Sequence, residues 1–154
     1  MAGLTCSITW EGEDLRKAQR GLALLSRAGA WMPAILGSIG EAVRQHTDDR
    51  WRKELDPSGQ PWKPLTKPYA KWKAKQPGAI QKTLQFTGRL RNSIAWQLVG
   101  DDAVAVGTPL EYAAPHQNPQ KPNQLRPFLG IDRADRVSMG RIIAKNIRAV
   151  LNAT

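Results

Sequence analysis

The hydrophobic period changes several times along the chain of 154 residues. Near the N-terminus, Leu4, Cys6, Ile8 and Trp10 alternate with threonine and serine. A period of two is typical of a half-buried strand, so residues 4–10 are predicted to form one. Cys6 then faces the core, which favours a small buried hydrophobic residue over a reactive thiol.

From Glu13 onwards the period is helical. Gly29 is expected to end a first helix, and Pro33 to lie in the first turn of a second helix that runs to about Glu54. Two helices joined so closely predict a hairpin or a bent pair. The positions that carry the apolar stripes are Leu15, Ala18, Leu22 and Leu25, then Met32, Ile35, Leu36, Ile39, Val43 and Trp51.

Residues 56–86 combine prolines with large aromatic residues and lysines, and are called the arm below. A short helix around Pro68–Lys75, with Tyr69 and Trp72 on one side, is the regular structure expected in it. Disordered segments lack large aromatic residues, so the arm is predicted to bury its rings on another surface, in its own domain or on a neighbour.

Apolar residues again occupy every second position at Ile94–Leu98, and a short run of β-prone residues follows at Ala103–Val106. Gly100-Asp101-Asp102 between them predicts a β-hairpin closed at Asp101-Asp102. Asp132, with Asp135 three residues on, is a variant of the capping box and predicts the start of the last helix. The stripe of that helix carries Met139, Ile143, Ile147, Val150 and Leu151.

These elements predict an α+β fold with a small, mostly antiparallel sheet, three main helices and the long Pro/Trp/Lys-rich arm. We expect one domain over residues 1–154. Its successive parts are a strand plus helical hairpin (1–55), the extended basic arm (56–86), a β-hairpin with loops (87–131) and a C-terminal helix (132–154).

Composition narrows the class of protein. The chain is 41% hydrophobic and 23% charged, and its longest nearly apolar run, residues 28–36, is too short to span a bilayer. A single cysteine excludes an internal disulfide and a cysteine-based zinc site. We therefore expect no membrane partner, with a reducing cytoplasm as the default compartment.

The net charge of +10 is uneven. Residues 55–100 hold eight basic and one acidic side chain, so that most of the excess lies in and beside the arm. A localised basic segment indicates a polyanion or an acidic protein as partner, and a solvated basic face with no ligand is the alternative.

Catalysis and metal binding are not expected. The two histidines, His46 and His116, are far apart in sequence, and His46 near a helix C-terminus has a structural explanation in the helix dipole. No nucleophile elbow or phosphate loop is present. We predict no enzyme activity, no cofactor and no metal site.

Two partners suit the arm. Its lysines can meet phosphates while its rings stack on bases, which is how single strands are held. The same residue types are frequent anchors of protein interfaces. The residues assigned to a subunit or partner interface are Trp62, Lys63, Lys67, Tyr69, Trp72, Lys73, Phe86, Arg89 and Arg91.

Five short motifs in order resemble the phage virion morphogenesis family, which includes tail completion and tail-to-head joining proteins of Mu-like phages. The similarity covers about two thirds of the chain, from about Trp51 onwards. It departs after His116-Gln117, where Asn118-Pro119 stands in place of an aromatic residue and a glycine. The motifs are Asp56-Pro57-Ser58-Gly59-Gln60-Pro61-Trp62-Lys63-Pro64-Leu65, Leu84-Gln85-Phe86-Thr87-Gly88-Arg89-Leu90-Arg91-Asn92-Ser93-Ile94, Val106-Gly107-Thr108, Tyr112-Ala113 with His116-Gln117, and Arg126-Pro127-Phe128-Leu129-Gly130.

The resemblance implies a structural, non-enzymatic virion protein, located at the head-tail junction of the virion and in the host cytoplasm during assembly. Relatives form rings at the head-tail junction, so we expect a homo-oligomeric ring, a hexamer, that acts in tail completion as a tail terminator, neck or connector component. Neighbouring neck and tail proteins, and phage DNA passing through the ring, are the further partners expected. A basic nucleic-acid-binding protein and an assembly factor that does not stay in the virion are the alternatives.

Overall fold

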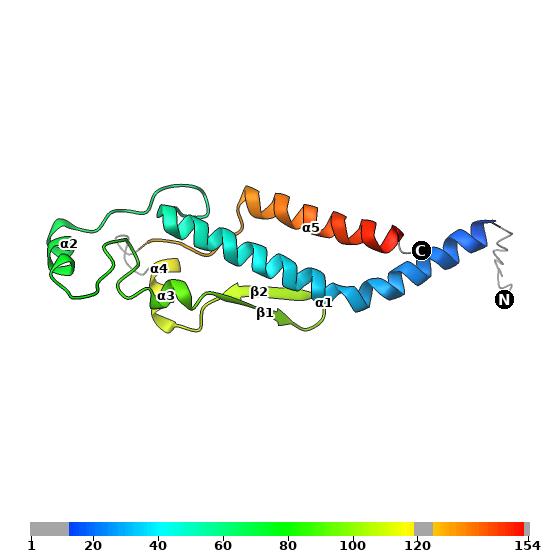
Figure 1. The fold of residues 1–154 in the computed structure, drawn as a ribbon, viewed down its shortest axis with the longest axis horizontal. Coiled ribbons are helices and arrows are strands. Elements are labelled where there is room, and N and C mark those ends of the chain that lie inside the picture. Colours follow the sequence, from blue (N-terminus) through cyan, green and yellow to red (C-terminus); the bar gives the residue numbers. More distant parts are fainter. Residues whose placement is uncertain (1–12, 119–124, 153–154) are drawn as a thin grey trace, which may run out of the picture.

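A computed structural model shows an elongated molecule built along one long helix, α1 (Glu13–Lys53) (Figure 1). It describes the backbone of residues 13–118 and 125–152 and the side chains of residues 31–118 and 125–149. The predicted strand at residues 4–10, with Cys6, lies outside these ranges. None of the helices in the described ranges is both long and apolar enough to cross a membrane.

The predicted helix boundary at Gly29 is wrong, because α1 continues through Gly29 and has Pro33 inside it. A proline inside a helix removes one backbone hydrogen bond and bends the axis. Figure 1 shows such a bend between the N-terminal and C-terminal parts of α1. The expected end of the helix near Glu54 is confirmed, since Glu54 has a left-handed backbone with φ 57°.

The predicted β-hairpin is confirmed. Strands β1 (Ala95–Val99) and β2 (Ala103–Gly107) pair antiparallel, with Val99 opposite Ala103. Trp96 packs its ring on α1 at Gly37 and Gly40, where an added Cβ atom would lie 3.1 Å and 2.8 Å from it. Any side chain at Gly40 would displace this ring, so these glycines allow the hairpin to approach the helix closely.

Helix α5 (Arg133–Asn152) lies along α1 and runs antiparallel to it (Figure 1). The predicted cap is confirmed: the Asp135 backbone N–H donates to Asp132 Oδ1, and the Asp132 N–H donates to Asp135 Oδ2. The Asp135 carboxylate, 1% exposed, also accepts from Arg50 at 2.9 Å and lies 2.7 Å from His46 Nδ1. His46 and Arg50 therefore have a structural role, fixing the start of α5 on α1.

A cluster of aromatic rings forms the core at the C-terminal end of α1. Trp51 is completely buried, and the ring centroids of Trp62 and Phe128 lie 5.3 Å and 4.8 Å from its own, in edge-to-face arrangements. We call these three rings the core cluster. Leu90, Ile94 and Ala113 complete the buried set.

Four short elements complete the described structure. They are α2 (Lys67–Ala74), α3 (Arg89–Asn92), the 3₁₀ helix η1 (Glu111–Ala113) and α4 (Ala114–Gln117). Helix α2 confirms the short helix expected in the arm, and the fold as a whole confirms the α+β class.

Candidate functional site

The first residues of the arm fold back onto α1. The Asp56 carboxylate accepts hydrogen bonds from the backbone N–H groups of Ser58 and Gln60, which closes a turn. The chain then returns to the end of α1, where the backbone N–H of Trp62 donates to the Glu54 carbonyl at 2.8 Å. This turn brings the Trp62 indole within reach of the core.

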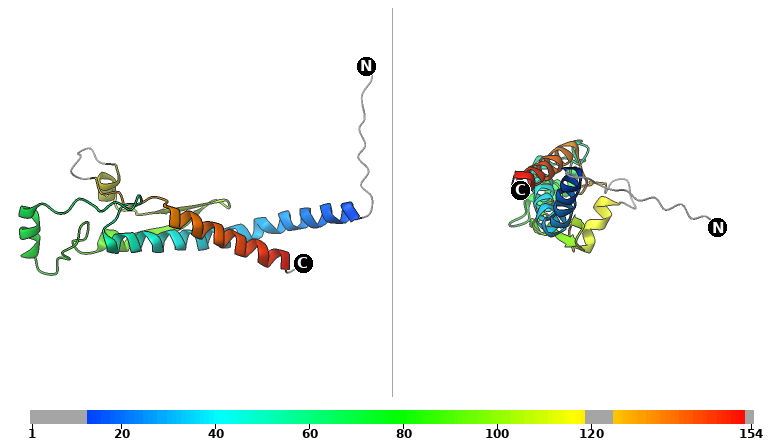
Figure 2. Two further views of the ribbon diagram at one scale, coloured as in Figure 1. Left: turned by 90° about the horizontal axis from the view of Figure 1, so that it is seen from above. Right: turned by 90° about the vertical axis from the view of Figure 1, so that its right-hand side faces the viewer.

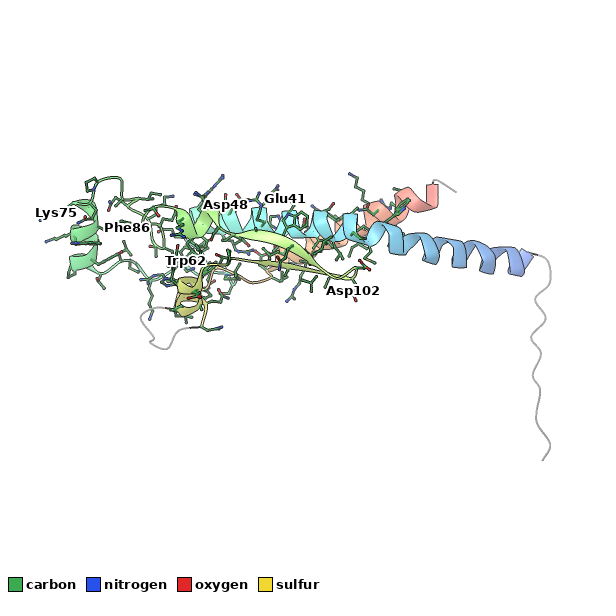
Figure 3. The ribbon with its side chains drawn as sticks, turned by 90° about the horizontal axis from the view of Figure 1, so that it is seen from below. Glu41, Asp48, Trp62, Lys75, Phe86 and Asp102 are labelled. Carbon is green, nitrogen blue, oxygen red and sulfur yellow. The ribbon has the colours of Figure 1, made fainter. Side chains whose placement is uncertain are left out.

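Trp62 is therefore a core residue, and its predicted place on a subunit interface is wrong. It is 7% exposed, and its indole N–H donates to the Pro127 carbonyl at 2.8 Å. The indole finds a partner for both its apolar body and its polar N–H within its own chain, which satisfies a buried tryptophan. Figure 3 places Trp62 in the body of the molecule and Phe86 towards the end that carries α2.

Beyond Trp62 the arm leaves the body and carries α2 at the far end of the molecule (Figure 1). There Tyr69, Trp72 and Phe86 form a stack, which we call the aromatic ladder. The centroid distance is 5.4 Å from Tyr69 to Trp72 and 5.9 Å from Trp72 to Phe86. The three residues are 43%, 49% and 38% exposed. The chain orders these rings without covering them.

Lys73 connects α2, which carries Tyr69 and Trp72, to the segment that leads to Phe86. Its Nζ donates to the carbonyls of Lys82 at 2.8 Å and Gln85 at 2.6 Å, and lies 6.0 Å from the centroid of Phe86. Burial lowers the pKa of the Lys73 ammonium, against a weaker upward effect from Glu54. Since Lys73 is 2% exposed, its predicted role as a partner-facing residue is wrong. It ties α2 to the segment Lys82–Gln85, where the arm returns to the body.

The remaining predicted cations divide into two groups. Lys63, Lys67 and Arg89 are exposed. Arg91 instead forms a two-pronged ion pair with Asp48 of α1, with an Nη2 to Oδ2 distance of 2.9 Å. Hydrogen bonds from Arg91 hold the pKa of Asp48 below its usual value, although partial burial raises it. Arg91 therefore fixes the chain after the arm to α1, which differs from its predicted place among partner-facing residues.

A groove of about 600 Å³ separates the arm from the body. Arg89 and Arg126 line it together with two rings of the ladder and Tyr112 of η1. None of its lining residues is acidic, so the groove suits an apolar or acidic segment. Its other lining residues are Leu65, Thr66, Lys73, Leu84, Gln85, Thr87, Gly88, Leu90 and His116.

A second groove, which the sequence did not reveal, lies where α1, β2 and α5 meet. It has a volume of about 300 Å³, and we call it the cradle. Its lining residues are all uncharged: Ile39, Val43, Thr47, Val104, Val106, Leu129, Gly130, Ile131 and Met139. They come from four separate segments of the chain. Sequence periodicity indicates the apolar face of a segment, but it does not show that these faces lie together in the folded protein.

The candidate sites among the described side chains are surface features. Within the described ranges, no group of three or more His, Cys, Asp or Glu residues could hold a metal ion. The features that remain are an exposed aromatic ladder, a basic groove and an apolar cradle.

Comparison with known proteins confirms the family resemblance. The family model described as the phage virion morphogenesis family matches residues 13–148. Neither the curated proteins nor the solved structures give a match. The family match covers nearly the whole described chain, including the arm, the hairpin and α5. The chain therefore belongs to the phage virion morphogenesis family, a family of structural proteins of phage virion assembly.

Proposed function

We propose that this chain is a structural component of the virion that forms a homo-oligomeric ring, a hexamer, at the head-tail junction and completes the tail there. The observation that carries the proposal is the aromatic ladder: Tyr69, Trp72 and Phe86 are ordered at the far end of the arm and stay between 38% and 49% exposed. Aromatic side chains that are ordered but exposed in the free subunit are typical anchors of protein interfaces.

The position of the ladder favours a contact between unlike surfaces of neighbouring copies. It lies at one end of an elongated subunit, beyond the C-terminal end of α1 (Figures 1 and 3). A contact of this kind repeats from copy to copy until rotation closes a ring. The exposed Lys63, Lys67 and Arg89 would form the polar rim around the rings.

Native mass spectrometry of the purified protein tests the ring. We expect a discrete oligomer, and expect Trp72→Ala to shift it towards monomer. Ser58→Ala, in an exposed turn at the base of the arm, is the control and leaves the oligomer unchanged. A wild-type protein that stays monomeric at every concentration would contradict the ring.

The copy number in purified virions tests the location. A fixed number of copies, equal to the ring number and labelled at the neck by an antibody in electron micrographs, is expected. Absence from purified virions would favour the assembly factor that acts without remaining in the particle.

Contact with nucleic acid is the second candidate, favoured by the exposed lysines Lys67, Lys71 and Lys75 on and beside the helix that carries Tyr69 and Trp72. Phosphates would meet the lysines. Binding of single-stranded DNA by the monomer, lost on raising the salt concentration from 50 to about 200 mM, would support this function. The stacking of the rings on one another limits the faces left for bases, which is why the protein interface is preferred.

A further inference from the structure

The cradle is an apolar site that the described chain leaves open. Ile39 and Val43 of α1 form its buried floor, Val104 and Val106 of β2 one wall, and Met139 of α5 belongs to the other. Ile131 at its rim is 47% exposed. A volume of about 300 Å³ is small for a ligand pocket, and it suits a row of side chains from one extended segment.

The sheet beside the cradle is incomplete. In the described ranges it has two strands, so each strand has one edge without a strand partner. Two-stranded hairpins are marginally stable alone, and a free edge accepts a further strand through its backbone N–H and carbonyl groups. A strand added at β2 would place alternate side chains over the cradle.

One segment of this chain fits that description. Residues 1–10 contain no charged side chain, although 23% of the chain is charged, and the cradle has no charged lining residue either. Within the segment, Leu4, Cys6, Ile8 and Trp10 form one face of the predicted strand, and threonine and serine form the other. Such a strand would direct its apolar face into the cradle and its hydroxyl groups to water.

The segment cannot reach the cradle of its own subunit. Along the helix axis, Glu13 lies about 39 Å from Ile39, the cradle residue of α1 nearest to it in sequence. Even fully extended, the chain from Leu4 to Glu13 spans only about 31 Å. Figure 2 shows the N-terminal part of α1 extending well past the hairpin and the end of α5.

We propose that residues 4–10 of one copy bind as an added strand in the cradle of the next copy. The contact deepens the proposed ring and rests on it, because the long α1 carries the donated segment away from its own cradle towards a neighbour. The partner is thus a second copy of this chain.

The alternation of apolar and polar residues in residues 4–10 provides the first test. Ile8→Asp puts a charge on the face directed into the cradle, and Thr9→Asp puts the same charge on the opposite face. We expect Ile8→Asp to raise the protein concentration needed for half-assembly about 100-fold, because a charge would be buried without a partner. Thr9→Asp should change it less than about threefold. The unfolding free energy of the monomer should be unchanged in both.

The single cysteine provides the second test. Wild-type protein, with Cys6 activated as a mixed disulfide, is mixed with a second stock in which Cys6→Ser removes the native thiol. That stock carries either Ile131→Cys in the cradle or Val137→Cys on α5 outside it. The two positions are matched, since Ile131 is 47% and Val137 is 46% exposed. We expect the link between copies to form at least about tenfold faster at position 131.

Each outcome decides the matter. A ring that assembles equally well with Ile8→Asp, or equal cross-linking at positions 131 and 137, overturns the strand exchange and leaves the ring standing. Loss of monomer stability in Ile8→Asp would also overturn it, because the segment would then pack in its own subunit. A wild-type protein that never assembles would contradict both the ring and the exchange.

Discussion

The core cluster and the aromatic ladder are each three rings, each draw on the same proline-rich and tryptophan-rich arm, and have opposite environments. Trp62 is 7% exposed, whereas Trp72, ten residues later, is 49% exposed. Composition does not separate the two tryptophans. The difference is that the turn at Glu54 and Asp56 brings Trp62 back to α1, while α2 carries Trp72 beyond the end of that helix.

The comparison shows that rings of the arm can have two environments. Trp62 joins Trp51 and Phe128 in the core cluster, whereas the three rings of the ladder stay partly exposed. In the ladder, Lys73 takes the place of an apolar floor, since its buried ammonium binds backbone carbonyls rather than a core. The ladder is thereby ordered with little apolar packing, which suits the assembly surface proposed for it.

The largest effect is expected from Trp62→Ala. Removing a buried indole from the core cluster should lower the unfolding free energy of the monomer by about 4 kcal/mol, measured by urea denaturation with far-ultraviolet circular dichroism. A variant as stable as wild type would remove the distinction between the two clusters.

Asp135→Ala tests whether the body has a second, ionic anchor independent of its rings. The change leaves the Arg50 guanidinium, 8% exposed, with Asp132 as its remaining carboxylate partner. It also removes the acceptor of the Asp132 backbone N–H and the group that contacts His46. It should lower the unfolding free energy by about 2 kcal/mol. Asp102→Ala, at the exposed hairpin tip, should change it by less than about 0.5 kcal/mol. If Asp135→Ala and Asp102→Ala changed the unfolding free energy equally, the ion pairs of Asp135 would not be what holds α5 on α1.

The Asp48–Arg91 pair, which fixes α3 to α1 just after the arm, predicts that stability depends on pH. Arg91 depresses the pKa of Asp48 in the folded state, so the stabilisation is complete above about pH 5 and is lost as the pH falls below about 4. Arg91→Met should therefore cost about 1 kcal/mol at neutral pH and progressively less in acid. Arg89→Met, at an exposed position, serves as the control and should show no such convergence with wild type.

The smallest effect on monomer stability is expected from Trp72→Ala, at less than about 0.5 kcal/mol. Its effect should fall on assembly instead, which sedimentation velocity would measure as a shift towards monomer. Destabilisation comparable to that of Trp62→Ala would mean that the ladder is part of the folding core.

Local patterns in the sequence predicted local structure well. The alternation around Gly100-Asp101-Asp102 predicted the hairpin, and the spacing of Asp132 and Asp135 predicted their reciprocal cap, because both depend on neighbouring residues. The continuity of α1 through Pro33 was missed, because the lost hydrogen bond is a local cost that the packing of the C-terminal part of α1 outweighs.

The candidate site was predicted only in part. The residue types of the arm pointed to a contact surface, but which tryptophan is covered depends on Pro127 and Phe128, more than sixty residues from Trp62. The cradle was missed for the same reason. Burial is decided by segments that meet only in three dimensions, so sequence spacing within one of them cannot reveal it.

The length of helix α1 sets how far the N-terminal end of the chain lies from the hairpin and α5. Its 41 residues give a rod of about 60 Å, and the hairpin and α5 lie along only its C-terminal part (Figure 2). Adding two turns to the part that extends past them would move the start of the chain outward by about 11 Å and leave every core contact as it is. In the proposed ring, the length of this one helix would therefore set the spacing between subunits, independently of the fold that it supports.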